Sequence, residues 1–200
     1  MIAPVPVMLE GYGVRLEPMT AGHQDALVAA AADGDVWKLW YVSVADLVAE
    51  RASAYMDAAL LGQARGDMLP WVVRELGTNT IVGSTRYHDI VPAIDRVEIG
   101  FTFYARAWQR THVNTACKLL LLTHAFDTLG CKVVAFRVDN LNLPSQRAVE
   151  ALGARLDGVL RHYQPRRDGS ARDMHVYSIL ASEWPDVRTR LLARLARHAR

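Results

Sequence analysis

Short runs of alternating apolar and polar residues recur along this 200-residue chain, and longer segments repeat apolar residues at helical spacing. Polar turns separate the strand-like runs, and Gly153 follows one helical segment as a favoured C-terminal stop. Ser43, with Asp46 three residues later, is typical of a helix start. The expected strands are Val14–Glu17, Leu69–Leu76, Ile81–His88, Val97–Tyr104, Lys132–Val138, Leu156–Gln164 and Arg172–Leu180, and the expected helices are His23–Ala32, Ala45–Ala64, Asn114–Thr128, Pro144–Leu152 and Glu183–His198.

The order of these elements predicts an α+β fold, with helices flanking a mixed and mostly antiparallel sheet. Gly77-Thr78-Asn79 and Asp168-Gly169 are typical of hairpin turns. The helix between the strands at 97–104 and 132–138 predicts one parallel strand–helix–strand crossover. Strands that part around such a crossover can hold a ligand between them. No linker or repeat interrupts the pattern, so residues 1–200 are expected to form one domain ending in an amphipathic helix over 181–200.

Composition is that of a globular protein, because 51% of the residues are hydrophobic and the mean hydropathy is near zero. A formal net charge of +2 is too small to imply a polyanionic partner. Cys117 and Cys131 are expected to be reduced core thiols, and no His/Cys spacing resembles a zinc site, so no metal is expected. The N-terminal residues lack a signal-peptide pattern and the apolar runs are too short for a membrane span, which favours a cytoplasmic protein without a membrane partner.

A strand, a short basic turn and a helix follow one another between Val97 and Leu122. This order directs the first amides of the helix toward the end of the strand, where they can bind an anion. Arg106 and Arg110 flank the turn, so a phosphate-bearing ligand is expected. Glu98 stands alone as a carboxylate in the strand, which suggests a general base beside a cofactor site. Strand alternation places Glu98 on one face with Gly100, Thr102 and Tyr104, opposite Val97, Ile99, Phe101 and Phe103.

Three segments resemble the GNAT acetyltransferase superfamily, and specifically its RimJ/RimL-like branch. Glu98 and the turn Gln109–Asn114 form the first match, and Asn142 and Ser145, before a helix that ends Leu152-Gly153, form the second. The third is the C-terminal stretch from GVLRHYQPRRDGS to EWP, and together the likeness covers about Val14 to Trp184. The resemblance implies a GNAT-type fold, acetyl-CoA as the acetyl donor, and a primary amine as the acceptor. That amine would belong to a protein N-terminus or to a small molecule.

The resemblance also implies how coenzyme A would be held. The turn is expected to cradle the pyrophosphate, Asn142 and Ser145 to border the pantetheine while capping their helix, and a strand amide near Phe101 or Thr102 to hold the oxyanion. His112 and Asn114 stand where the family usually has glycine, so the pyrophosphate would bind through amides of a helix capped by Thr111 or Asn114. The implied pyrophosphate-binding residues are Gln109, Arg110, Thr111, His112, Val113 and Asn114.

Only a neutral amine attacks a thioester, so the reaction needs a proton acceptor. Glu98 matches the general base of histone-type relatives, and its alternative is a structural ion pair with Arg86 or Arg96. Asp157 is the second candidate, because RimL-like enzymes carry an acidic residue there; the alternative is a solvated aspartate at a strand end.

The departing thiolate poses a separate question, because many relatives protonate it with a tyrosine at the position of Val149. Ser145, Tyr163 or Tyr177 would then replace that acid, or the thiolate would leave unassisted.

Two further groups of residues have competing interpretations. Trp37, Trp40 and Tyr41 either line the acceptor pocket or pack in the core. The last helix places Trp184, Val187, Leu191 and Leu195 on one face and Arg188, Arg190, Arg194 and Arg197 on the other. A solvated face is the simplest interpretation, ahead of contact with acidic RNA or a second subunit in a homodimer. Two rival functions follow: a coenzyme A-binding sensor or scaffold without catalysis, and a nucleic-acid-binding protein, which is not expected and whose affinity would fall steeply with salt.

Overall fold

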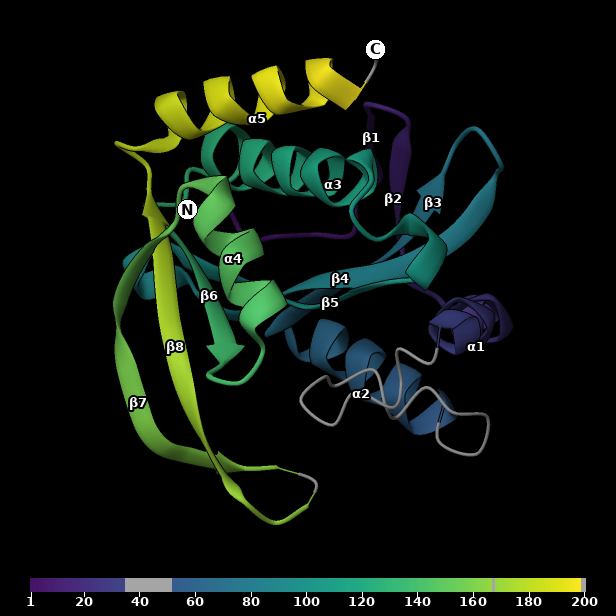
Figure 1. Ribbon diagram of the computed structural model, residues 1–200, viewed down its shortest axis with the longest axis horizontal. Helices are drawn as coiled ribbons and strands as arrows, with labels where there is room; N and C mark the ends of the chain where they lie inside the picture. The colour runs from purple at the N-terminus through teal and green to yellow at the C-terminus, as the bar shows by residue number, and fades with distance from the viewer. Residues whose placement is uncertain (35–51, 167, 199–200) are drawn as a thin grey trace.

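A single eight-stranded sheet with helices on both faces forms the framework of the protein (Figure 1). The computed structural model describes residues 1–34, 52–166 and 168–198. The strands are β1 (Leu9–Gly11), β2 (Val14–Pro18), β3 (Met68–Glu75), β4 (Thr80–Val91), β5 (Arg96–Tyr104), β6 (Val133–Asp139), β7 (Arg155–Pro165) and β8 (Ala171–Leu180). The helices are α1 (Gln24–Ala32), α2 (Ala52–Arg65), α3 (His112–Thr123), α4 (Leu143–Leu152) and α5 (Trp184–His198).

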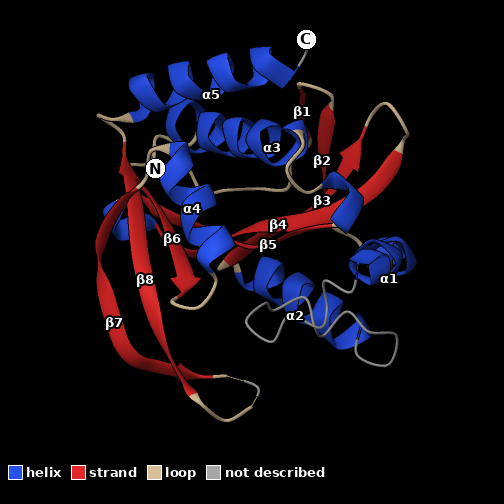
Figure 2. Cartoon of the chain, in the orientation of Figure 1, coloured by secondary structure: helices blue, strands red, loops and turns tan. Residues whose placement is uncertain are grey.

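The sheet has the order β1-β2-β3-β4-β5-β6-β8-β7, and only β5 and β6 run parallel (Figure 2). The α+β prediction, with one parallel crossover in a mostly antiparallel sheet, is therefore confirmed. Strand β1 was not predicted, because its three residues are too few to show a hydrophobic period. Gly153 ends α4 in the left-handed conformation, with a φ of 104°, as its place in the sequence predicts.

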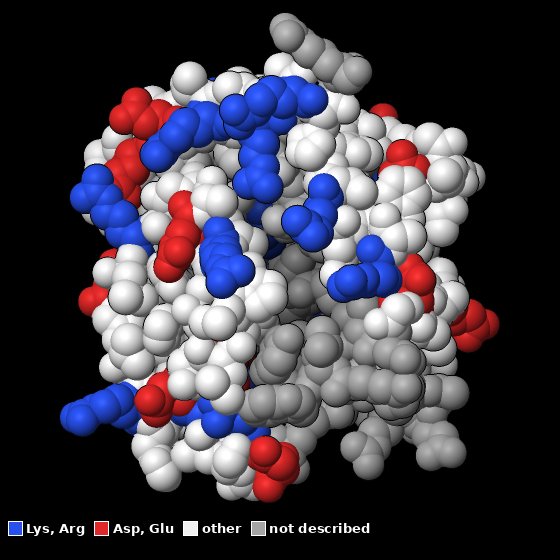
Figure 3. All heavy atoms as spheres, viewed as in Figure 1, with Lys and Arg blue, Asp and Glu red and all other residues white. Residues whose placement is uncertain are grey.

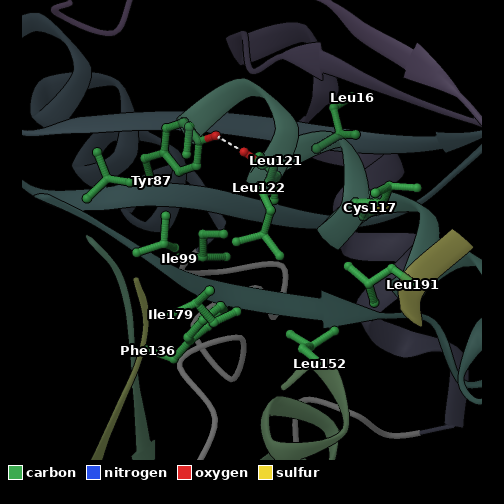
Figure 4. Close-up of a cluster of buried hydrophobic side chains, with 14 of the residues drawn as sticks. Leu16, Tyr87, Ile99, Cys117, Leu121, Leu122, Phe136, Leu152, Ile179 and Leu191 are labelled. Atoms are coloured by element: carbon green, nitrogen blue, oxygen red, sulfur yellow. Dashed lines mark hydrogen bonds between the residues drawn. The ribbon is translucent and has the colours of Figure 1, made fainter. Parts of the chain in front are cut away.

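The larger hydrophobic core lies between the sheet and helices α3, α4 and α5. Figure 4 shows this core, to which α3 contributes Leu121 and Leu122, β5 contributes Ile99 and α4 contributes Leu152. The hydroxyl of Tyr87 donates a hydrogen bond to the carbonyl of Leu121 and so ties β4 to α3. The predicted apolar face of the last helix is buried: Trp184, Val187, Leu191 and Leu195.

A smaller core fills the opposite face, where α1 and α2 cover β3, β4 and the end of β5. Tyr55 and Met56 of α2 pack there with Val72 and Phe103. The two faces are referred to below as the α3 face and the α2 face. Trp37, Trp40 and Tyr41, and the predicted helix start at Ser43, lie outside the described residues.

Helix α3 begins two residues earlier than its apolar pattern predicts, at His112 rather than Asn114. Thr111 caps it, since its hydroxyl accepts a hydrogen bond from the amide of Val113 at 3.3 Å. The α-helix then gives way to a π-helical turn over His124–Thr128, where a continuous helix was predicted. Sequence periodicity does not distinguish five residues of π-helix from one more turn of α-helix.

A β-bulge at Phe101 corrects the predicted faces of β5. The register to β4 shifts between Ser84 and Arg86, and Phe101 takes a left-handed φ of 50°. Val97 and Ile99 lie in the α3-face core as predicted, but Phe103 lies in the α2-face core. Since the bulge inserts one residue, every side chain after it exchanges faces, and the prediction of one apolar stripe from Val97 to Phe103 is wrong.

Candidate active site

The parallel strands β5 and β6 part directly after Glu98. Their pairing covers only Arg96 with Val133, Val97 with Val134, and Glu98 with Ala135. From Ile99 onward, the edge of β5 that faces β6 has backbone groups without a partner in the ladder, and the bulge falls within this stretch. Free amides beside a bulge can donate to a ligand carbonyl, so the predicted oxyanion donors near Phe101 and Thr102 lie where such a ligand would be held.

The turn before α3 is held by its own side chains. The amide of Gln109 donates to the carbonyl of Tyr104 at 3.1 Å, and the hydroxyl of Thr111 donates to the carbonyl of Trp108 at 2.7 Å. Arg110 between them has a φ of 64° and an exposed side chain. The first amides of α3 have no partner within the helix, and together with the exposed arginines they suit a phosphate group. Figure 3 shows basic side chains over α5 and around the start of α3.

His112 occupies the first of the two positions where glycine is usual, and its side chain turns away from the helix start. It lies against the β1–β2 turn, where a Cβ added to Gly13 would meet its Nε2 at 3.1 Å. Its charge also contributes to lowering the pKa of Glu75 at the end of β3. Asn114 is half-buried in the first turn of the helix, and Val113 is buried beneath it. The helix therefore keeps its amides free of the His112 ring.

Asn142 caps α4 as predicted, with its Oδ1 accepting from the amide of Ser145 at 3.1 Å. The loop before it is fixed by Gln146, whose amide donates to the carbonyls of Asp139 and Asn140. Arg166 then joins this loop to the β7–β8 hairpin through an ion pair with Asp139 at 3.0 Å. These bonds hold Asn142 and Ser145 at the end of β6, on the other side of the gap from the bulge.

Glu98 lies on the α2 face in a network of polar side chains. Its Oε1 lies 3.2 Å from Nε2 of His88, and its Oε2 accepts from Nε of Arg137 at 2.7 Å. Arg137 also pairs with Asp89 and donates to the hydroxyl of Tyr163. Glu98 therefore forms an ion pair, as one interpretation of the sequence expected, but its partners are not Arg86 or Arg96. Arg96 pairs with Asp89, and Arg86 pairs with no carboxylate of the described chain.

The pKa of Glu98 reflects these partners. Burial alone would raise it, but the hydrogen bonds and charges of His88 and Arg137 outweigh that effect and hold the pKa below its usual value. A carboxylate that stays ionised and almost fully buried is well suited to orient the imidazole beside it. His88 itself is more accessible than Glu98, with 16% of its side chain exposed against 4%.

Gly100 allows His88 to lie across β5. A Cβ added to Gly100 would stand 2.2 Å from Nε2 of His88, so the imidazole would have to move from its present position. The ring of Phe101 packs edge-on against the same imidazole, with centroids 5.0 Å apart. His88 was not singled out from the sequence, where it ends an ordinary strand; the only local signal is Gly100 on the neighbouring strand, two residues beyond Glu98, which pairs with His88.

The structure does not bring Asp157 together with Glu98. Asp157 is exposed on edge strand β7 and accepts a hydrogen bond from Ser178 at 3.0 Å. Strands β6 and β8 separate it from β5, which is about 14 Å at ordinary strand spacing.

The hydroxyls of Ser145, Tyr163 and Tyr177, the candidates to protonate the departing thiolate, lie in three different environments. Tyr177 is buried and donates to Glu150, and burial raises its pKa to about 12. Tyr163 accepts from Arg137, while Ser145 is half-buried at the start of α4. Val149, the residue at which the resemblance implies a tyrosine acid, packs in the α3-face core.

Lys118 is the second functional candidate that sequence reasoning missed. It belongs to α3, is 5% exposed, and donates to the hydroxyl of Thr102 at 3.0 Å, which in turn meets the hydroxyl of Thr85. Burial lowers its pKa from 10.5 to about 8. Its ammonium therefore sits on the α3 face, one residue beyond the bulge that marks the gap. A lysine in an apolar helix stripe reads as a solvated residue, and only the structure shows that it is buried.

Residues 1–34, 52–166 and 168–198 contain neither a metal-binding cluster nor a membrane-spanning helix. Within those ranges, no group of three or more His, Cys, Asp or Glu side chains is placed to hold a metal ion. No helix of the described chain has the length and hydropathy to span a membrane.

Comparison with known proteins gives a consistent result. Residues 14–155 match the family model described as the acetyltransferase (GNAT) domain. YoaA, an uncharacterised N-acetyltransferase of Bacillus subtilis (strain 168), is 24% identical over 174 residues, which are 86% of this chain and 96% of YoaA. A GCN5-related N-acetyltransferase from Brucella melitensis superposes with a TM-score of 0.88 at 29% identity, over 96% of this chain and 87% of that one. Mycobacterium smegmatis RimJ, solved with CoA-disulfide, has the same fold, with a TM-score of 0.80 at 22% identity over 94% and 95% of the two chains.

Proposed function

Because this chain belongs to the GNAT acetyltransferase family, we propose that it is a single-domain cytoplasmic enzyme that transfers acetyl from acetyl-CoA to a primary amine. The observation that carries this proposal is the parting of β5 and β6 at the Phe101 bulge, between the capped start of α3 and the Asn142 cap of α4. An anion-binding helix start, free strand amides and a capped loop surround one gap. Such an arrangement suits a long ligand with a phosphate end and a carbonyl end.

The proton acceptor we assign is the His88–Glu98 pair rather than Glu98 alone. With Nε2–H donated to Glu98, Nδ1 of His88 keeps its lone pair and can take a proton from the incoming ammonium. The neutral amine then attacks the thioester carbonyl, and the resulting oxyanion is held by the strand amides near Phe101 and Thr102. Glu98 stabilises the imidazolium that forms, as a buried carboxylate does for an adjacent histidine.

Lys118 supplies the acid that Val149 does not. When the tetrahedral intermediate collapses, the carbon–sulfur bond breaks and the thiolate takes a proton from the ammonium of Lys118. The nitrogen loses its second proton to solvent, and Lys118 regains one from solvent. A donor whose pKa is about 8 is matched to a thiol, which ionises near ~8.5. The lysine would also donate to a thioester or pantetheine carbonyl before the reaction, in place of its bond to Thr102.

The test is a thermal-shift titration with acetyl-CoA, followed by mass spectrometry of a panel of amines and peptides after incubation with acetyl-CoA. Acetyl-CoA at 100 times its Kd should stabilise the fold by about 2.7 kcal/mol. A single acetylated acceptor establishes the transfer. The absence of any shift at saturating acetyl-CoA would overturn the proposal, and a shift without product would favour the coenzyme A sensor.

A further inference from the structure

Arg86 is a buried guanidinium with no anionic partner among residues 1–34, 52–166 and 168–198. It lies in the middle of β4 on the α2 face and is only 2% exposed. Its Nη1 donates to the sulfur of Met68 at 3.3 Å, while its Nε and Nη2 have no hydrogen-bond partner in the part of the chain that the structure describes. Arginine cannot give up its proton, so a buried and unpaired guanidinium is costly unless a ligand completes it.

The neighbouring carboxylate does not serve Arg86. Both oxygens of Glu98 are taken, one by His88 and the other by Arg137. The contacts that remain to the guanidinium are aromatic: its carbon lies 4.3 Å from the ring centre of Tyr55 and 4.6 Å from that of Phe101. Aromatic faces hold a guanidinium in place, but they do not satisfy its N–H groups.

The two unpartnered nitrogens are those of one edge of the guanidinium. Nε–H and the nearer N–H of Nη2 point in the same direction, and this edge matches the two oxygens of a carboxylate. The third nitrogen, on the other edge, is the one directed to Met68. The free groups are thus arranged as a fork for a planar anion rather than scattered around the side chain.

The free edge of the Arg86 guanidinium lies close to the proposed proton acceptor, His88. Arg86 pairs with Gly100 in the ladder, next to the bulge, and the Phe101 ring contacts both Arg86 and His88. His88 follows Arg86 by two residues on the same strand and face, which is about 7 Å along the chain. An anion on Arg86 would therefore belong to the molecule whose amine meets His88, and not to coenzyme A, which the α3-face groups serve.

We infer that the acceptor of this enzyme carries a carboxylate close to its amine, and that Arg86 binds this carboxylate through Nε and Nη2. This inference rests on the proposed acetyl transfer and narrows its acceptor to amino acids and to peptides with an acidic residue at the N-terminus. Both sources present an ammonium and a carboxylate a few ångströms apart. Arg86 is then a substrate-binding residue that fixes the amine relative to the His88–Glu98 pair.

The experiment compares acceptors in matched pairs with the wild-type enzyme, so it does not depend on any variant folding. Each pair consists of a free amino acid and its amide, or of a peptide beginning with Asp or Glu and the same peptide beginning with Asn or Gln. The kcat/KM should be about 10- to 100-fold higher for the carboxylate member, mainly through KM. The pair type with the larger ratio identifies the source. Equal kcat/KM values within every pair would overturn the inference and leave the acetyl transfer standing.

Arg86→Lys then tests the fork itself, because it keeps the charge and removes the two-pronged edge. It should raise KM for the carboxylate acceptor about 10-fold or more, and leave kcat/KM for the amide within about twofold. Arg65→Lys is the matched control, since Arg65 forms only an exposed pair with Asp67, and it should change neither value. Equal losses on both acceptors in Arg86→Lys, with its melting temperature unchanged, would overturn the role of Arg86.

Discussion

Lys118→Met should make the protein more stable and less active at the same time. The side chain is buried on the α3 face, and among the described residues it donates a hydrogen bond only to the Thr102 hydroxyl. Burial lowers its pKa from 10.5 to about 8. At pH 7 a shift of that size costs the folded state about 3 kcal/mol. Methionine fills a similar volume without a charge, so the variant should recover about 2–3 kcal/mol of unfolding free energy.

The sign of the pH dependence follows from the direction of the shift. Since the folded pKa of Lys118 lies below its unfolded value, the unfolded chain binds more protons between pH 8 and pH 10.5. The cost of the charge is therefore complete below pH 8 and fades as the pH rises. It should fall from about 3 kcal/mol at pH 7 to about 1.5 kcal/mol at pH 9.5, and the advantage of Lys118→Met should shrink with it.

Urea denaturation of both proteins at pH 7 and pH 9.5 measures this difference. Lys132→Met is the control, because Lys132 is exposed and its replacement should change stability by no more than about 0.5 kcal/mol. Turnover of Lys118→Met should be about 10- to 100-fold lower than that of wild type. Any decrease of the wild-type kcat above pH 8 should be absent from the variant. If Lys118→Met were no more stable than wild type at pH 7, or equally more stable at both pH values, the buried-charge argument would be refuted.

Three further predictions concern the same site. Glu98→Gln should lower kcat about 100-fold or more and destabilise the fold by about 3 kcal/mol at pH 7. Because the folded protein lowers the pKa of Glu98, the carboxylate contributes to the free energy of unfolding above about pH 4.5 and loses this contribution below it. The urea midpoints of variant and wild type should therefore converge toward about pH 3. Gly100→Ala should displace His88 and lower kcat, while the affinity for acetyl-CoA measured by calorimetry stays unchanged. Gly158→Ala is the control, because its Cβ would lie in open space, and it should match wild type. Normal turnover in Gly100→Ala would contradict the role of His88 as proton acceptor. His112→Gly should cost about 0.5–1 kcal/mol of stability without tightening acetyl-CoA binding, and a tenfold gain in affinity would show that the ring obstructs the phosphate.

The sequence predicted the fold well because its signals there are local. Hairpin turns, helix periodicity and the Gly153 stop each depend on a few neighbouring residues, and the structure follows them. The bulge at Phe101 is different, because nothing in an alternating strand reveals one inserted residue. The faces predicted for β5 are consequently correct up to Ile99 and wrong at Phe103.

In the candidate site, too, features set by neighbouring residues were predicted and features set by tertiary contacts were not. Thr111 and Asn142 are capping residues identifiable from the sequence, and both cap the helices expected of them. His88, Arg86 and Lys118 were missed in their present roles, because burial and partners depend on which strands and helices meet. These three charged or titratable side chains belong to two largely apolar segments, β4 and α3, and only their meeting at one bulge suggests a shared chemical role.

In the proposed reaction, the bulge lets β5 contribute to the sites of both substrates. Thr102 follows it on the α3 face and accepts from Lys118, while Phe101 within it turns to the α2 face and contacts His88 and Arg86. In a regular strand Phe101 would share the α3 face with Ile99, and Thr102 would share the α2 face with Gly100. The bulge reverses both positions, and so brings Phe101 to Arg86 and His88 and Thr102 to Lys118. Lys118 and Arg86 thus lie on opposite faces of the sheet at the bulge. Both are buried cations without a carboxylate partner in the described chain. Each costs the fold stability on its own, and the enzyme recovers that cost only when a thioester lies on one side and an anionic acceptor on the other. This arrangement predicts that acetyl-CoA and acceptor each stabilise the protein independently, so their thermal shifts should add.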